Sequence, residues 1–297
     1  MLSITQIAIL SLLQEYVIAD RSILQAACGI KDDARMREIL RAMTAKGWID
    51  RVQIKSECLV GTKPVYFANE AGCALLASVT GDMGKLHNCR APKTSFTYFT
   101  HYLGVTRALL RIVKALRSQV DVELVRFLTE HHYVRPGKML LTEVGEGRRG
   151  RTKVCAPDGA FVIRRRDRCR VYFFEFSTGS DGSPTREAAK KSPGYAAFIG
   201  GMIFKQLFPE ADDAKVLAIV PNIGYREHMR RALQGKGGEH WLLVRGEDLE
   251  TDFIHVPVFH SPIAEEPTPL VRTPPPSPVA PVPTGVTPGE VSLIVNR

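Results

Sequence analysis

The stretch that most constrains how this chain can fold covers residues 157–179, PDGAFVIRRRDRCRVYFFEFSTG. It is typical of two strands joined by an arginine-rich turn. Pro157 disfavours the helical conformation for the residue before it, which favours a strand that begins just after the proline. The second run, VYFFEF at 171–176, is almost continuously apolar and aromatic, which indicates a buried central strand. Only Glu175 interrupts it. Because an unpaired buried carboxylate costs on the order of several kcal/mol, Glu175 should have a cation, a donor or a metal ion as partner.

The overall charge of the chain favours a polyanionic partner. The 297 residues hold 40 Lys+Arg against 31 Asp+Glu, a net charge of +9, within an ordinary globular composition of 44% hydrophobic residues. Nucleic acid and an anionic membrane surface are the two partners that such a charge suits. No apolar run approaches the roughly 18 residues that span a bilayer, and no basic segment precedes the first apolar residues. We therefore expect a cytoplasmic protein with no membrane span.

The cysteines are expected to be free thiols. There are six of them and no C-x-x-C pair, so a disulfide framework or a common zinc motif is not indicated. A zinc site is the alternative, although its spacings match no common pattern. It would use Cys58, Cys73, His87 and Cys89.

The first 80 residues predict a winged helix-turn-helix that binds DNA. Helices are expected at 5–16, at 21–28 between an Asp20 cap and Gly29, and from 32 or 33 to 46. Strands at 48–54 and 64–68 would form the wing, before a helix at 70–79. Basic residues lie on or beside the third helix and the wing, the elements that contact DNA in such domains: Lys31, Arg35, Arg37, Arg41, Lys46, Arg51 and Lys63. The alternative is a winged helix used only for protein contacts, with these charges on a solvated face.

The rest of the chain predicts a linker at 81–94, an α/β domain at 95–256 and a proline-rich tail at 257–297. The pattern of the second domain is a helix at 95–116, a strand at 120–128, a polar insertion at 129–156, the two strands described above, a helix at 186–195, a strand at 215–221, a helix at 225–233 and a strand at 241–244. Eleven of the 19 prolines fall in the tail, which is expected to be disordered and outside the fold. The fold class is therefore α/β (α+β), with a mixed sheet.

Two carboxylates on neighbouring strands, Asp158 and Glu175, are the arrangement that divalent-metal nucleases use. Mg²⁺ or Mn²⁺ needs only one or two carboxylates because it keeps several waters, and it neutralises charge on a phosphodiester. A lysine normally assists by orienting or deprotonating the attacking group or by stabilising charge. Basic residues of the insertion and the turn would hold the DNA backbone: Arg148, Arg149, Arg151, Lys153, Arg164, Arg165, Arg166 and Arg168. In the structural alternative, Asp158 caps a turn and Glu175 pairs with an arginine.

Several segments resemble the replication-relaxation family, also called MobC-like, over roughly residues 3–250. They are ILRAMTAKGWIDRVQ with KPVYFANEAGCALL, then HYLGVTRALLRI, APDGAFVI, YFFEFSTGS, a helix with lysine and tyrosine, and VLAIVP. The resemblance implies an N-terminal winged helix followed by a restriction-endonuclease-like domain of the PD-(D/E)xK type. Some members, encoded on plasmids and other mobile elements, are relaxases that nick at a transfer origin, whereas others are known only as replication and relaxation factors.

The resemblance assigns roles residue by residue. Asp158 matches the aspartate of the "PD" motif, and Glu175 matches the acid of a segment that reads E-x-D-x-G-T in the family and EFSTG here. Ser177 stands where an aspartate is commoner and where orthodox nucleases carry lysine, and serine supplies neither charge nor a strong Mg²⁺ ligand. Lys190 or Lys191 on the next helix would replace that lysine, and His101 matches a histidine of the preceding helix. Tyr195 matches a helix tyrosine that we do not interpret as a nucleophile.

Three functions follow as hypotheses. The first is a metal-dependent relaxase-like nickase that acts at an origin during plasmid mobilisation or conjugation. The second is an accessory replication factor whose nuclease-like domain is inactive, which Ser177 favours. The third is a transcriptional regulator that senses a ligand, although no glycine-rich phosphate loop supports it. The expected partners are double-stranded origin DNA, single-stranded DNA, and mobilisation or replication proteins.

Overall fold

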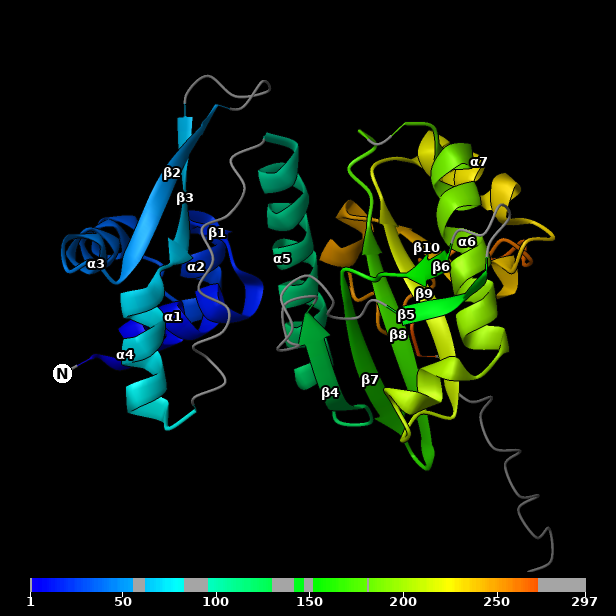
Figure 1. The fold of residues 1–297 in the computed structure, drawn as a ribbon, viewed down its shortest axis with the longest axis horizontal. Helices are drawn as coiled ribbons and strands as arrows, with labels where there is room; N and C mark the ends of the chain where they lie inside the picture. Colours follow the sequence, from blue (N-terminus) through cyan, green and yellow to red (C-terminus); the bar gives the residue numbers. More distant parts are fainter. Residues whose placement is uncertain are drawn as a thin grey trace, which may run out of the picture.

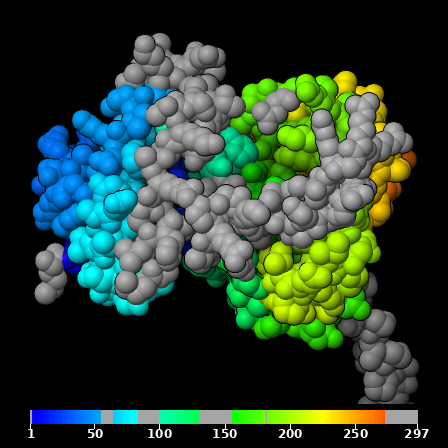
Figure 2. Space-filling model, in the orientation of Figure 1, coloured from blue at the N-terminus to red at the C-terminus, as the bar shows by residue number. Residues whose placement is uncertain are grey.

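A computed structural model describes residues 2–55, 62–82, 96–129, 142–146, 152–180 and 182–271 of the chain. The fold is mixed α+β, which confirms the predicted class. Figure 1 shows a largely helical N-terminal unit (α1–α4, blue to cyan) beside an α/β unit that begins with α5. The two units occupy opposite halves of the face seen in Figure 2.

The N-terminal unit has the predicted order of helices and hairpin. The helices are α1 (Ile4–Tyr16), α2 (Arg21–Cys28), α3 (Asp33–Ala45) and α4 (Glu70–Thr80). Strand β2 (Ile49–Lys55) pairs antiparallel with β3 (Thr62–Ala68), and the short β1 (Ala19–Asp20) pairs with the other edge of β3. The side chain of Asp20 caps α2 by accepting from Ile23 N at 2.8 Å, and Gly29 ends that helix with a left-handed φ of 67°.

The α/β unit is built on a five-stranded sheet in the order β10-β9-β8-β7-β4. Its strands are β4 (Glu123–Thr129), β7 (Gly159–Arg165), β8 (Arg168–Phe176), β9 (Asp213–Val220) and β10 (Trp241–Arg245). Strands β8, β9 and β10 run parallel, while β4, β7 and β8 pair antiparallel. The apolar run at 171–176 is therefore the central strand that its composition predicts. Two short strands, β5 (Thr142–Glu146) and β6 (Thr152–Cys155), pair within the segment predicted as a polar insertion.

Helices cover both faces of this sheet (Figure 1). Helix α5 (Phe96–Arg117) packs on one face with Tyr172 and Phe174, whereas α6 (Pro184–Gly200) and α7 (Ile223–Leu233) pack on the other with Val171 and Phe173. Successive side chains of a strand point to opposite faces, so Glu175 faces α6. Helix α6 begins at Pro184, two residues before the predicted start at 186, and Ser183 caps it. Single 3₁₀ turns follow at Ile203–Gln206, Gly238–His240 and Glu247–Glu250.

The folded part extends beyond the predicted limit at residue 256. Phe259 is fully buried, Leu270 and Val271 are nearly so, and Phe259 forms a β-bridge with Thr268. These side chains pack into the α5-side core beside Phe253. The sequence places the boundary too early because this segment is rich in proline and has only a few large apolar residues.

The described cysteines confirm the thiol prediction only in part. Cys28, Cys155 and Cys169 are free, whereas Cys73 is disulfide-bonded, so the prediction of a free thiol is wrong there. Cys58, His87 and Cys89 of the zinc alternative lie outside the described residues. Across the described ranges, no helix has both the length and the apolar character that crossing a membrane requires.

Candidate active site

The two acids predicted for the site lie side by side at one end of the hairpin formed by β7 and β8. The backbone N–H of Asp158 donates to Phe174 O at 2.9 Å, just beyond the last strand pair, Gly159 with Phe174. The Asp158 carboxylate lies close enough to Glu175 to raise its pKa. Its Oδ2 accepts from the N–H of Phe176 at 2.8 Å. Asp158 is thus fixed just before β7, at the end of the strand pair, and its side chain remains 13% exposed.

Helix α6 supplies the partners that Glu175 requires. Nζ of Lys191 lies 2.6 Å from Oε2 of Glu175, and the hydroxyl of Tyr195 donates to Oε1. Lys191 and Tyr195 are four residues apart, and therefore lie on the same face of the helix. Lys190 is exposed, so the structure places only the second of the two predicted lysines in contact with Glu175.

The electrostatics of this group follow from its burial. Desolvation raises the pKa of Glu175 to about 7, an effect that the nearby Lys191 opposes and the Asp158 carboxylate reinforces. For Lys191, burial alone would lower the pKa, but the carboxylates of Glu175 and Glu187 outweigh burial and the pKa is raised. Desolvation and the neighbouring Glu175 also raise the pKa of the Tyr195 hydroxyl. Lys191 therefore stays an ammonium, and Tyr195 stays a neutral donor.

Ser177 belongs to a second hydrogen-bonded group beside the first. Its Oγ donates to Oε2 of Glu187 at 2.7 Å, and Tyr225 of α7 donates to the same carboxylate oxygen. The other oxygen of Glu187 accepts from Nζ of Lys191 at 2.8 Å. Although burial opposes ionisation, Lys191 and these donors hold the pKa of Glu187 below its usual value. Lys191 thus lies between two carboxylates, one from β8 and one from its own helix.

His101 reaches the site from the opposite helix layer. Its Nε2 lies 3.1 Å from Oδ1 of Asp158, and its ring meets Phe176 edge-on. Gly104 allows α5 to come this close, because a Cβ at that position would lie 2.2 Å from the ring of Phe176. The structure thus brings His101, predicted to belong to the site, into contact with Asp158.

The donor set has the composition that a single Mg²⁺ or Mn²⁺ ion accepts. Asp158 and Glu175 offer four carboxylate oxygens, each of which already accepts one hydrogen bond and keeps a further lone pair. One or two carboxylates are enough for Mg²⁺. No cluster of three or more His, Cys, Asp or Glu side chains suited to a metal ion occurs in the part of the chain that the structure describes. Of the described residues, Asp158 and Glu175 are the ones that would hold such an ion, with waters or phosphate oxygens completing its shell.

The basic residues predicted to bind DNA fall into separate places. On and beside α3 and β2, six of them are exposed: Lys31, Arg35, Arg37, Arg41, Lys46 and Arg51. Nζ of Lys46 sits over the ring of Trp48, and Arg37 pairs with Asp33 at 3.2 Å. Arg148, Arg149 and Arg151 lie outside the described residues, as do the side chains of Lys63 and Lys153.

The arginine-rich turn is not beside the acids. It joins the far ends of β7 and β8, about 20 Å from Asp158 at the usual rise per strand residue. Two of its arginines pair with acids that precede or begin β4: Arg164 with Glu123 at 2.8 Å and Arg165 with Asp121 at 3.0 Å. Arg166 and Arg168 are exposed. The structure therefore separates this turn from the site, contrary to the expectation that it would hold phosphates there.

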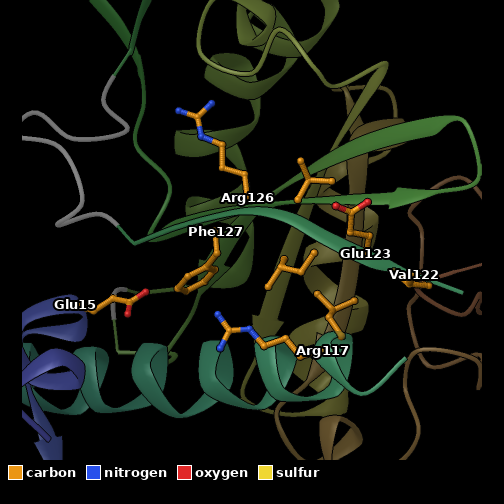
Figure 3. A pocket seen from close by; sticks show the side chains of 9 residues that line it. Glu15, Arg117, Val122, Glu123, Arg126 and Phe127 are labelled. Carbon is orange, nitrogen blue, oxygen red and sulfur yellow. The ribbon is translucent and has the colours of Figure 1, made fainter. Parts of the chain in front are cut away.

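A pocket of about 510 Å³ lies between the C-terminal half of α5 and β4. Figure 3 shows Arg117 rising from the helix toward Phe127 and Glu15, with Arg126 on the other side of the strand. Arg126 donates to Leu207 O at 2.8 Å. His101 and Arg117 are 16 residues apart on α5, about 24 Å along the helix, so this pocket is separate from the candidate site.

Comparison with known proteins gives a family for this arrangement. The model of the family described as replication-relaxation matches residues 10–210, more than half of the chain, including Asp158, Glu175 and Lys191. The chain belongs to the replication-relaxation family. Membership suggests a role in replication or relaxation of plasmids or other mobile elements, and involvement with DNA and the mobilisation machinery. No curated protein and no solved structure matches the chain.

Sequence reasoning missed two residues of this candidate site, Glu187 and Tyr225. Glu187 precedes Lys191 by four residues, as Lys191 precedes Tyr195, and this spacing places all three on one helix face. This spacing in the sequence could have predicted that Glu187 lies beside Lys191. Tyr225 had no such signal, because its contact depends on how α7 packs against α6.

Proposed function

We propose that this protein binds origin DNA of a plasmid or other mobile element and nicks one strand in a metal-dependent reaction at Asp158, Glu175 and Lys191. The observation that carries the proposal is the position of Lys191. Its ammonium lies 2.6 Å from Glu175, which in turn has the Asp158 carboxylate as a neighbour. Two acids and a lysine are the groups that metal-dependent phosphodiester cleavage requires. Ser177 stands where nucleases carry that lysine, so another residue has to supply the positive charge.

Each residue has a distinct task in this reaction. The chemistry that a bound Mg²⁺ or Mn²⁺ supplies is neutralisation of charge on the phosphoryl oxygens and a lowered pKa of a bound water. Asp158 and Glu175 would hold the ion. Lys191 would stabilise the negative charge that develops on the phosphate, because its raised pKa keeps it protonated throughout the physiological range. His101, beside Asp158, would orient that carboxylate.

The N-terminal unit would select the DNA. Its exposed basic residues on α3 and β2 form the surface that a winged helix-turn-helix presents to the major groove and the flanking backbone. Membership of the replication-relaxation family supports DNA as the partner.

The second candidate is an accessory DNA-binding factor whose α/β unit has no catalytic activity. One observation favours it: Glu175 is only 3% exposed and both of its oxygens already accept hydrogen bonds from protein groups. In that case the Glu175–Lys191 pair stabilises the fold and does not contact DNA.

Nicking of a supercoiled plasmid that carries the element's own origin separates the two candidates. The wild type should convert it to the open-circular form with Mg²⁺ or Mn²⁺. Asp158→Asn, Glu175→Gln and Lys191→Gln should each reduce the rate by at least about a hundredfold while origin binding persists. Lys205→Gln, an exposed lysine on the 3₁₀ turn after α6, is the matched control and should nick normally. Origin binding without nicking under any divalent metal would reject the nickase and leave the accessory factor.

A further inference from the structure

Ser177, the residue after β8, is uncharged, and a charged group from the next helix lies beside it. That group is the carboxylate of Glu187 on α6. Oε2 of Glu187 accepts from Ser177 Oγ at 2.7 Å. Ser177 itself is fixed, because its backbone N–H donates to Ile219 O at 2.9 Å and continues the pairing with β9. Ser177 is thus a rigid anchor for a charge on the helix.

Glu187 is a buried charge with a full set of partners. Its side chain is only 8% exposed, and an ionised carboxylate in such a place persists only when it is paired and hydrogen-bonded. Oε2 accepts from Ser177 and from the Tyr225 hydroxyl, and Oε1 accepts from Lys191. These contacts join α6, α7 and the residue that follows β8 around one carboxylate.

This arrangement determines where the ammonium of Lys191 can lie. A lysine side chain has four rotatable bonds and loses its preferred position easily. Here Nζ is held at 2.6 Å from Glu175 and 2.8 Å from Glu187, and its side chain is 25% exposed. Removal of Glu187 would leave one anchor, on which the ammonium can pivot.

We propose that Glu187, held by Ser177 and Tyr225, positions the Lys191 ammonium beside Glu175 and Asp158, so that α6 supplies both the acid and the cation that are missing at Ser177. Glu187 is a positioning residue in this proposal, because it acts on the reaction through Lys191. The proposal rests on the proposed nickase for its catalytic meaning. The positioning itself is a property of the free protein.

The test measures how firmly the Lys191 ammonium is held in the full chain without DNA or metal. NMR relaxation of ¹⁵N-labelled lysine ammonium groups reports the mobility of each Nζ separately, and Lys191→Gln assigns the signal. In the wild type, the Lys191 ammonium should be rigid and the exposed Lys205 should be the mobile reference. Replacement of Glu187 removes one of two anchors, so Glu187→Gln should lower the order parameter of the Lys191 ammonium toward that of Lys205, whose own value stays unchanged.

A purely structural role predicts a different result. If Glu187→Gln lowers the free energy of unfolding but leaves the Lys191 ammonium as rigid as in the wild type, the proposal is overturned. If this variant does not fold, Glu187→Asp is used. It keeps the charge but withdraws it by one methylene, and should loosen the ammonium by a smaller amount. An unchanged order parameter again overturns the proposal.

The nicking assay distinguishes this failure from that of the proposed function. If positioning serves catalysis, Glu187→Gln should lower the nicking rate about tenfold or more, and Glu187→Asp should restore part of it. Nicking by the wild type, together with a Lys191 ammonium that stays equally rigid in Glu187→Gln, would reject the positioning role alone. A loosened ammonium in a protein that never nicks would reject the nickase and confine Glu187 to holding Lys191.

Discussion

Glu175 carries a charge that its surroundings oppose, and the stability of the fold should depend on pH as a result. Burial raises its pKa from 4.5 to about 7. Because the folded-state pKa lies above the unfolded value, this group contributes stability that is fully present below pH 4.5 and is lost as the pH rises through 7. Glu175→Gln does not titrate. Between pH 4.5 and 7, its unfolding free energy relative to wild type should therefore improve by up to about 3 kcal/mol.

Urea unfolding at several pH values between these limits checks this prediction. Glu38→Gln, which changes an exposed carboxyl of α3, is the control for removal of one negative charge. A constant difference between Glu175→Gln and wild type across the range would show that Glu175 is ionised equally easily in the folded and unfolded states.

At the residue scale, the sequence predicted the partner of Glu175 in kind but not in detail. A buried carboxylate needs a cation or a donor, and Lys191 and Tyr195 supply both. The choice between Lys190 and Lys191 was open, because adjacent helical residues differ by about 100° in direction and only the packing of α6 decides which faces the sheet. The contact of Ser177 with Glu187 was not predicted, since it depends on the same packing.

At the scale of elements, the approach of α5 to β8 depends on one glycine. A Cβ at Gly104 would lie 2.2 Å from Cζ and 2.3 Å from Cε1 of Phe176. Gly104→Ala should therefore displace the Phe176 ring or the helix and lower the free energy of unfolding by about 1–3 kcal/mol. Gly200→Ala is the matched control, because it adds the same methyl group at the end of α6 with no atom within 4 Å. Urea unfolding of both variants gives the comparison, and equal stabilities would contradict the close packing.

The predicted elements agree with the structure where hydrophobic periodicity is strong, and differ where it is weak. The run at 171–176 and the helix at 95–116 have a clear pattern, and β8 and α5 appear there. Strands β5 and β6 lie in a polar, glycine-containing segment whose composition predicts a loop. Residues 257–271 have a composition typical of a tail, yet three apolar residues of this segment are buried. Their burial depends on a surface that only the assembled sheet provides.

At the scale of the whole molecule, α5 connects the predicted DNA-binding unit to the candidate site. Thr106 donates to Ile18 O at 3.2 Å, and Arg107 pairs with Asp20 at 3.0 Å. Phe99, close to His101 on the same helix, is buried against Val65 and Phe67 of β3. The sequence predicted two domains joined by a linker and gave no sign of these contacts, since none of them follows from local spacing. DNA held by the N-terminal unit would therefore have a defined position relative to Asp158.

The basic residues of the N-terminal unit and those of the arginine-rich turn lie in separate places, so their contributions to DNA affinity can be measured separately. Each phosphate contact contributes about 0.9 to the slope of log K against log salt concentration. A triple variant of the N-terminal unit, Arg35→Gln, Arg41→Gln and Arg51→Gln, should therefore reduce the slope by about 2 to 3 and weaken binding at low salt. A double variant of the distant turn, Arg166→Gln and Arg168→Gln, removes exposed charges without touching α3 or β2, and its slope should stay near that of wild type. Fluorescence anisotropy with origin duplex over a salt series measures both. A larger loss in the double variant would move the DNA path to the far end of the β7–β8 hairpin, and wild-type affinity that does not change with salt would exclude nucleic acid as the partner.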